Sequence, residues 1–346
     1  MDTAHTKKQD IVIALLAVLA LIAVGFVLRV AQVVVLPLVI AWLLSYLLSP
    51  AVVFAARHRL PVSLAVLIVL VLVIALCYGI GVFLYARTAD LVAQYWMYED
   101  KLSVIADAVS ERFQIDWSKL AALDWNRQVS GYLVSLSGSL VSFVSNLLLV
   151  GIFLVFILLG HAGFGATLRT AFARERADKI LLVLDSIAAD IRQYLAIQFV
   201  LSLVTGVLVW LALWAIGVQF AVTWGALTFL LNFIPTIGSI IAALPPVLIA
   251  FVQFYPNPWP GVVSLAAIMI VQNVLANVVG PKVMGDKLNL SPIVVLLSLV
   301  FWGWLWGAVG AILSVPIASA IKVVCANIEP LHPVSTLMGS HKGTRK

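Results

Sequence analysis

Hydrophobic residues in this chain form long blocks, and charged residues interrupt them at only a few places. Blocks close to the roughly 20 residues that cross a bilayer core occur at 11–28, 31–49, 62–85, 140–160, 195–216 and 261–279. We predict that these six blocks are full transmembrane helices. The first two are joined by a very short turn at Arg29, and Pro50 closes the second.

The apolar block at 221–252 is too long for one crossing. As a single helix it would extend about 48 Å, whereas the bilayer core is about 30 Å thick. Pro235 and Gly238 divide it near the middle, and Pro245-Pro246 adds a further kink because proline lacks a backbone N–H. Broken backbone at membrane depth must be buried in protein or line a cavity. We therefore predict a re-entrant helical hairpin over 221–252.

The apolar block at 292–321 has the same character. Gly303, Gly307 and Gly310 interrupt it, and Pro316 follows. We predict a second re-entrant helical hairpin over these residues. A second interpretation stays open, because glycines four positions apart also permit the close approach of two straight helices.

Polar segments divide the chain into four parts. Spans one to three occupy residues 1–85, and an external polar segment follows at 86–139. Its apolar residues recur in steps of three and four, as in an amphipathic helix: Leu91, Tyr95, Tyr98, Leu102, Ile105, Val109 and Phe113. Residues 140–325 form the predicted transport core, with a charged amphipathic stretch at 161–192, and residues 326–346 form a tail.

The positions of Lys and Arg predict the topology. Basic residues collect in cytoplasmic loops. With both termini in the cytoplasm and two hairpins, the basic loops around Arg57, Arg169 and Lys282 and the basic C-terminal tail all lie on that side. If 221–252 and 292–321 crossed the membrane instead, Lys282 and Lys287 would lie outside. The charge distribution favours the hairpins.

Composition defines the class of protein. Hydrophobic residues make up 63% of the chain and charged residues 10%, whereas soluble domains contain about 25% charged residues. The chain is predicted to be an all-α integral membrane protein. Its net charge of +6 reflects topology, and we expect no nucleic-acid partner.

Motifs for catalysis or metal binding do not occur in the sequence. Cys77 and Cys325 are far apart, and the five histidines are scattered, so neither a metal site nor a disulfide is expected. A phosphate-binding Gly-x-x-x-x-Gly-Lys loop and a Gly-x-Ser-x-Gly elbow do not occur either. We predict a protein that is not an enzyme and has no cofactor.

Polar groups deep in the apolar blocks are the candidate site. None of the spans or hairpins contains an acidic residue, which favours a neutral or anionic solute held by hydrogen bonds. The alternative that these amides only bind helices together stays open. The candidate substrate-binding and gating residues are Asn232, Pro235, Thr236, Gly238, Ser239, Gln272, Asn273, Asn277, Gly303, Gly307, Gly310 and Ser314.

Three motifs together resemble the autoinducer-2 exporter family. They are Asn232-Phe-Ile-Pro-Thr-Ile-Gly238, Gly280-Pro-Lys-Val-Met-Gly285 with Leu290-Ser-Pro292, and the stretch from Trp306 to Pro316. The resemblance covers about residues 10–325. The chain departs from the family at Thr236, at Ser239-Ile240 and at Ser291, where the family commonly has histidine.

The resemblance implies a multi-pass transporter of the bacterial cytoplasmic membrane. Family members look like homopentamers in which each subunit carries two helical hairpins and moves its substrate by an elevator-like motion. Some members export autoinducer-2, a small polar compound derived from a furanone, and others exchange sodium or lithium for protons. The resemblance therefore implies a homo-oligomer that contacts membrane lipid and a small polar solute.

We hypothesise that the chain exports a small polar metabolite, for which autoinducer-2 is a candidate. A cation–proton antiporter is the first alternative, and it would require a carboxylate relay at Asp185, Asp190 or Asp286. A membrane scaffold that binds partners through residues 86–139 is the second.

Overall fold

The computed structural model is all-helical. It describes residues 22–58, 61–93, 125–284 and 290–339, together with residues 12, 15–16, 19–20 and 104. The principal helices are α2 (Gln32–Arg57), α3 (Val62–Ala93), α6 (Trp125–Ala171), α7 (Arg174–Ile216), α8 (Ala221–Leu231), α9 (Ile237–Gln253), α10 (Trp259–Asn273) and α12 (Pro292–Ala326). Most of the predicted external segment at 86–139 and the end of the tail lie outside the described residues.

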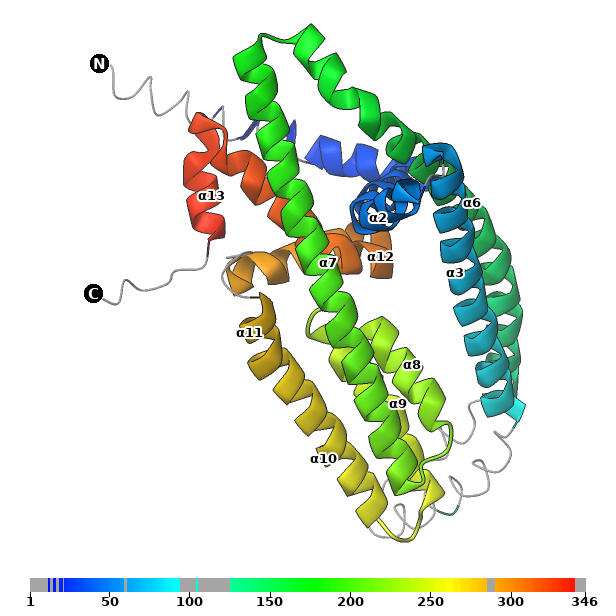
Figure 1. The fold of residues 1–346 in the computed structure, drawn as a ribbon. Coiled ribbons are helices and arrows are strands. Elements are labelled where there is room, and N and C mark those ends of the chain that lie inside the picture. Colours follow the sequence, from blue (N-terminus) through cyan, green and yellow to red (C-terminus); the bar gives the residue numbers. More distant parts are fainter. Residues whose placement is uncertain are drawn as a thin grey trace, which may run out of the picture.

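Helix α7 connects two separate hydrophobic cores. Figure 1 shows it running through the molecule, with α8, α9 and α10 along one half and α2 and α12 beside the other. Val209 and Leu213, in the C-terminal half of α7, pack with Trp224 of α8 and Ile268 of α10. Ile191, in the N-terminal half, belongs to a different cluster, which α2 and α12 complete. One rigid helix therefore links the two helix groups.

Helices α2, α3 and α6 form a third core. Ala41 and Val52 of α2 pack with Val66 of α3 and with Leu154 and Leu158 of α6. This core lies beside α7 rather than around the two breaks predicted from the sequence. It therefore supports the other helices without contributing to the candidate site.

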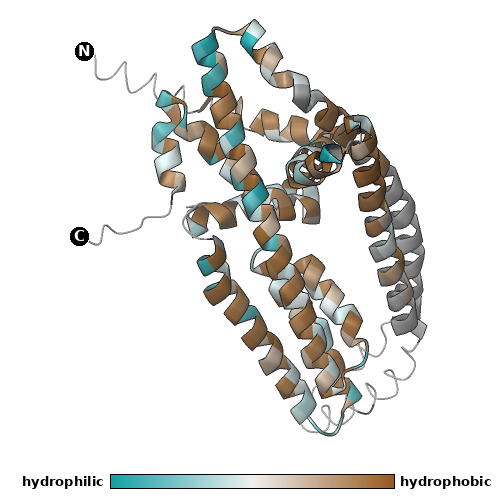
Figure 2. Cartoon of the chain, in the orientation of Figure 1, coloured by the Kyte–Doolittle hydropathy of each residue, from teal (hydrophilic) through white to brown (hydrophobic). Residues whose placement is uncertain are grey.

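Several helices have the length and composition of membrane spans. In the described part of the chain, five helices are long and apolar enough to cross a membrane, and a bent pair at 146–160 and 163–171 raises the number to six. The apolar colour in Figure 2 covers much of α3, α8, α9 and α10, while polar residues of α7 are frequent toward its N-terminus. Many large apolar side chains are exposed, for example Leu72, Phe156 and Trp214. The chain is a multi-pass membrane protein.

The ends of some helices differ from those predicted. Helix α2 continues through Pro37 and Pro50 to Arg57, because a membrane helix tolerates the missing N–H of a proline when it packs on its neighbours. Helix α6 begins at Trp125 rather than at 140, since the small residues that precede the apolar block remain helical. Residues 22–30 are also helical, and Ala31 N–H still donates to the Val27 carbonyl at 2.8 Å. The connection at Arg29 is thus a bend in a helix rather than a loop.

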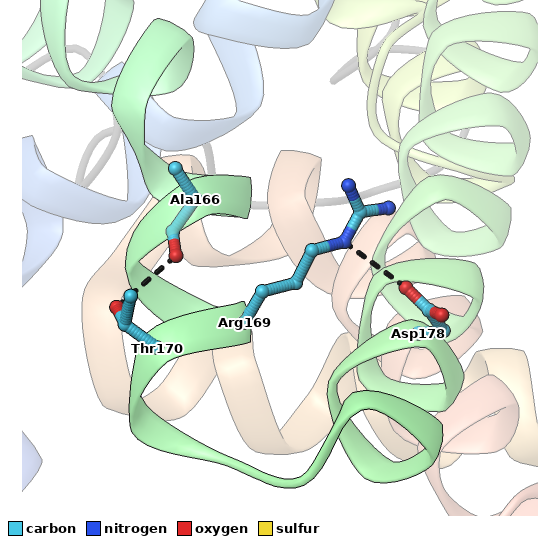
Figure 3. A network of polar contacts seen from close by, with 4 residues as sticks. All are labelled: Ala166, Arg169, Thr170 and Asp178. Atoms are coloured by element: carbon cyan, nitrogen blue, oxygen red, sulfur yellow. Dashed lines mark hydrogen bonds and ion pairs between the residues drawn. The ribbon is translucent and has the colours of Figure 1, made fainter.

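A tight connection joins α6 to α7 at 172–173. Arg169 Nε donates to Asp178 Oδ1 at 3.1 Å across this connection, and Thr170 Oγ1 donates to the Ala166 carbonyl at 3.1 Å (Figure 3). Both members of the ion pair are well exposed. Exposed pairs of this kind contribute little to stability.

Short elements complete the fold. A π-helix, η1 (Val274–Val279), and α11 (Gly280–Met284) follow α10, and a 3-10 helix, η2 (Glu329–Leu331), and α13 (His332–Met338) follow α12. Leu290 and Gly339 form an isolated antiparallel bridge, and Ser291 N–H donates to the Met338 carbonyl at 2.9 Å. The residue after α13 is thereby attached to the start of α12.

Candidate functional site

Helices α8 and α9 form a helical hairpin. The side chain of Gln253 holds the two ends of this hairpin together. Gln253, at the end of α9, accepts a hydrogen bond from Gln219 N–H at 2.8 Å through Oε1. Its Nε2 donates to the Gly217 carbonyl, also at 2.8 Å. Because positions 217 and 219 precede α8, the chain enters and leaves this hairpin at the same place.

The tip of the first hairpin is a strained turn at Thr236. Ile237 N–H donates to the Pro235 carbonyl at 2.6 Å, which makes a γ-turn with Thr236 at its centre. Thr236 has φ 63° and ψ −54°, a conformation that non-glycine residues rarely adopt. Such strain costs about 1–3 kcal/mol and persists only where the surrounding structure imposes it. The break predicted at Pro235 is therefore real.

Gly238 permits the backbone to close around this turn. A Cβ at this position would overlap the carbonyl oxygen of Leu231, the last residue of α8. Gly238 N–H donates to the Ile234 carbonyl at 3.1 Å. Only glycine fits a backbone approach this close, so Gly238 is required by the packing of the tip itself.

Polar side chains hold the tip of the first hairpin against α7 and α10. Gln198 Nε2 donates to the backbone carbonyl of Asn232 at 2.7 Å, and Asn232 Nδ2 donates to Ser202 Oγ at 3.1 Å. On the other side, Gln272 Nε2 of α10 donates to the Ser239 carbonyl at 2.9 Å. Asn232 and Ser239 are half-buried. Three predicted residues, Asn232, Ser239 and Gln272, thus lie at one tip.

Close packing of α8 against α7 fixes the position of the first hairpin. Gly206 of α7 faces Gly225 of α8, and a Cβ on Gly206 would lie 2.7 Å from the carbonyl oxygen of Gly225. A Cβ on Gly225 would lie 2.6 Å from Cβ of Trp210. The two backbones therefore touch, as at other membrane helix crossings between small residues.

Helix α12 also folds back on itself. Trp306 (φ −126°, ψ 15°) and Gly307 (φ 66°, ψ −146°) leave the helical conformation. Ser298 Oγ donates to the Ser314 carbonyl at 2.8 Å. A straight helix would separate these positions by about 24 Å, so the two limbs of α12 lie against each other.

Three of the predicted residues have distinct places in this second hairpin. Gly307 supplies the positive φ at the bend, and a Cβ on Gly310 would overlap the Trp302 carbonyl oxygen. Ser314 is fully buried, and its hydroxyl donates to the Ala311 carbonyl at 2.7 Å. In both hairpins, a glycine that follows the bend therefore packs against a carbonyl oxygen that precedes it.

The tips of the two hairpins meet. Ile234 from the first tip forms a buried cluster with Leu299 and Ala311, which come from the two limbs of α12. Leu231 and Ile312 pack against this cluster. The contact is apolar, and it brings together two breaks that lie about 70 residues apart in the sequence.

The other two predicted amides do not reach either tip. Asn277 Nδ2 donates to Asn273 Oδ1 at 3.1 Å, and Asn273 Nδ2 donates to the Met269 carbonyl at 2.9 Å. Both side chains are exposed in the single chain. Asn277 lies within the π-helix η1, an element that is often found at functional sites.

Sequence reasoning missed several polar residues around the hairpins. Gln198, Ser202 and Gln253 bind backbone or amide groups about 30–36 positions away, and no local pattern marks them. Thr223 and Thr228 of α8 carry buried hydroxyl oxygens that have no hydrogen-bond partner among the described residues. A buried hydroxyl without a partner is costly, so these two oxygens need a further polar group.

Two acidic residues of α7 lie close to other helices rather than in a free flank. Asp185 and Asp190 lie in the N-terminal half of α7, which packs on α2 and α12. Within the described residues no group of three or more His, Cys, Asp or Glu side chains could hold a metal ion.

Two helical hairpins that meet at broken, polar tips resemble the discontinuous helices that form solute sites in secondary transporters. The model of the AI-2E family of transporters matches residues 13–329. The chain belongs to this family.

Curated relatives agree with this assignment. The AI-2 transport protein TqsA of Escherichia coli (strain K12) is 32% identical over 90% of this chain and 90% of its own length. A protein of Borreliella burgdorferi is 33% identical over 93% of this chain and 89% of its own length. The Escherichia coli protein YhhT is 30% identical over 93% of both chains.

Proposed function

We propose that the protein exports a small polar metabolite, with autoinducer-2 as the first candidate, by an elevator-like movement of the two hairpins. The observation that carries the proposal is the apolar contact of Ile234 with Leu299 and Ala311 between the tips. Polar backbone and amide groups surround this contact, as alternating access at the interface of broken helices requires. The name of the relative TqsA supports autoinducer-2 as the solute to test first.

The contacts around the tips favour a movable arrangement. Hydrogen bonds tie the first tip to α7 and α10, through Gln198 and Gln272, and tie the limbs of α12 to each other, through Ser298. Between the tips the described contact is apolar. Separating the tips would expose apolar surface without breaking these ties, so each hairpin moves as a unit.

In this proposal each hairpin returns to the side of the membrane from which it entered, the first to the outside and the second to the cytoplasm. Helix α8 has 11 residues and α9 has 17, about 17 and 26 Å, and both fall short of the roughly 30 Å core. Cysteines introduced at Asn257 and Asn289 test the topology. Labelling from outside at 257 and from inside at 289 is expected, and the reverse pattern would mean that both segments cross the bilayer.

Export through the tips predicts that Asn232 matters for flux. In sealed vesicles, Asn232→Leu should strongly reduce autoinducer-2 efflux, because it removes the amide that faces Ser202. Asn257→Leu, in the connection after α9, is the matched control and should transport normally. Normal flux of a folded Asn232→Leu protein would exclude this role.

We also propose that the chain acts as a homo-oligomer in the bacterial inner membrane, with both termini in the cytoplasm. The exposed amides of Asn273 and Asn277 support an arrangement in which a polar surface or a second subunit covers them, because hydrocarbon is a poor solvent for amides. The mass of the particle in nanodiscs tests the oligomer. A monomer that transports at the full rate would refute it.

Sodium–proton exchange is the second candidate function. Asp185 and Asp190 lie on the part of α7 that packs on α2 and α12, and this position favours a carboxylate relay as the mechanism to test. Asp185→Asn, Asp190→Asn and Asp286→Asn should each retain autoinducer-2 efflux if the exporter proposal holds. Loss of pH-coupled sodium flux in any of them would favour the antiporter.

A further inference from the structure

Arg29 lies against the tip of the second hairpin. Its guanidinium stacks over the ring of Trp304, with Cζ 4.8 Å from the ring centroid. Leu28, the residue before Arg29, makes a second contact: Trp306 Nε1 donates to the Leu28 carbonyl at 3.3 Å. Two independent contacts thus hold the bend after residue 28 on the residues where α12 reverses.

The local backbone is adapted to this contact. In an unbroken helix the carbonyl of Leu28 would accept a hydrogen bond from the residue four positions later. Ala31 has ψ 8°, outside the usual helical range, and the carbonyl accepts the Trp306 indole instead. The bend at Ala31 therefore frees a backbone acceptor for the hairpin tip and turns Arg29 toward it.

A single charge in this position is unusual. Arg29 is the one charged residue between Asp10 and Arg57 in the sequence. A charge at the bend between two apolar blocks is costly where it faces hydrocarbon, so Arg29 needs a polar or aromatic partner. Stacking on Trp304 satisfies the face of the guanidinium but leaves the N–H groups at its edge available. Among the described residues no carboxylate forms an ion pair with Arg29.

The bend at Gly307, three residues after Trp304, has open space on one side. A Cβ added at Gly307 would meet no atom within 4 Å, whereas a Cβ added at Gly310 would collide with backbone. Trp304 is 62% exposed, and Arg29 is exposed as well. Both members of the stacked pair are therefore accessible in the single chain, and the bend three residues after Trp304 has open space beside it.

We propose that Arg29 selects the charge of the transported solute, and that this solute is a small organic anion bound between the Arg29 guanidinium and the bend at Gly307. A planar guanidinium recognises two oxygens of a carboxylate, a phosphate or a similar anionic group with parallel hydrogen bonds. The inference rests on the transport function proposed above and narrows its substrate class. The anionic oxygens could also come from a lipid headgroup, and the experiment separates the two sources.

The test compares purified wild-type protein with Arg29→Gln, Arg29→Lys and the matched control Arg57→Gln, which removes an exposed charge at the end of α2. Thermal unfolding is followed in neutral detergent during titration with glycerate or with uncharged glycerol. Glycerate should stabilise the wild type and Arg57→Gln, and glycerol should stabilise neither. The apparent affinity for glycerate should fall about 10- to 100-fold in Arg29→Gln and less in Arg29→Lys.

Three results would overturn the assignment. Glycerate could stabilise Arg29→Gln as well as the wild type, glycerol could act as well as glycerate, or glycerate could leave the wild type unchanged. If Arg29→Gln fails to fold, Arg29→Lys provides the test, because it keeps the charge but loses the planar guanidinium. Equal glycerate affinity in the wild type and in Arg29→Lys would then contradict recognition of the anion by the guanidinium.

Nanodiscs identify the source of the anion. The solute assignment predicts Arg29-dependent stabilisation by glycerate in phosphatidylcholine nanodiscs. Stabilisation that requires phosphatidylglycerol, with no effect of glycerate, would assign the site to lipid and overturn the solute assignment. Glycerate binding and autoinducer-2 efflux are separate measurements. A protein that binds glycerate through Arg29 but moves no autoinducer-2 would refute autoinducer-2 as the substrate and leave the Arg29 assignment intact.

Discussion

Replacing Gly225 by alanine should loosen the first hairpin from α7. The added Cβ would lie 2.6 Å from Cβ of Trp210 and 2.7 Å from the carbonyl oxygen of Gly206. Carbon atoms pack at about 3.5–4.0 Å, so the helices must separate by roughly 1 Å. Overpacking of this kind costs about 1–3 kcal/mol. Because two of the neighbouring atoms belong to backbone or to a Cβ, we expect a value near the upper end, about 3 kcal/mol.

The separation should also disturb the tip. Gln198 and Ser202 lie on the same face of α7 as the crossing, and both bind Asn232. A shift of roughly 1 Å would stretch these hydrogen bonds beyond the usual 2.7–3.2 Å. Gly225→Ala should therefore lower the unfolding midpoint in detergent and reduce efflux in vesicles at equal protein content.

Gly303→Ala is the control for this experiment. A Cβ at Gly303 would meet Cβ of Ala311 at 3.8 Å, which is ordinary contact. Alanine also favours helix by about 0.5–1 kcal/mol relative to glycine. Gly303→Ala should therefore be as stable as the wild type or more stable. If Gly225→Ala unfolded at the wild-type temperature and transported normally, the close packing of α7 and α8 described here would be wrong.

Three further changes have defined outcomes. Gln253→Leu removes two hydrogen bonds at the base of the first hairpin and should cost about 2 kcal/mol, measured as a lower unfolding midpoint; an unchanged midpoint would mean that the base is held by packing alone. Gln198→Leu leaves the Asn232 carbonyl without its donor, so efflux should fall while the protein stays folded in size-exclusion chromatography; full efflux would contradict the support described for the tip. Arg169→Ala breaks the exposed pair with Asp178 and should change stability by less than about 0.5 kcal/mol, and a larger loss would show that the connection between α6 and α7 is more strongly coupled.

The breaks in the apolar blocks could be predicted from the sequence because they depend on local chemistry. Pro235 and Gly238 stand where the backbone forms a strained turn, and Gly307 stands where φ is positive. Long apolar blocks predicted an all-helical membrane protein for a similar reason, since chain length and hydropathy alone determine which helices can span a bilayer.

Contacts between distant segments could not be predicted in this way. Gln198 and Gln253 look like ordinary polar residues near the ends of apolar blocks, and their partners lie about 34–36 positions away. The meeting of Ile234 with α12 depends on the tertiary fold alone. Helix ends were also uncertain, because proline and small residues inside α2 and α6 do not stop helices that neighbouring helices support.

The side chains proposed to line the site fall into two groups for a physical reason. Asn232 lies at the first tip itself, and Gln272 reaches it because the broken helix exposes the Ser239 carbonyl, which requires a donor. Asn273 is only one position after Gln272, yet a helix turns by about 100° per residue, and this side chain faces away. Asn273 and Asn277 are four positions apart, and their hydrogen bond shows that the two side chains share a face.

The most direct test of the account is a reversible crosslink between the hairpin tips. Ile234→Cys and Ala311→Cys are combined in a protein whose Cys77 and Cys325 are replaced by alanine, and a short thiol crosslinker joins them. Ser298→Cys with Ser314→Cys, which joins the two limbs of α12, is the control. Joining the tips should stop efflux until the crosslink is released, and joining the limbs should leave efflux at the level of the same double variant before crosslinking. Full efflux through a protein with completely crosslinked tips would contradict the claim that the tips must separate for a solute to pass.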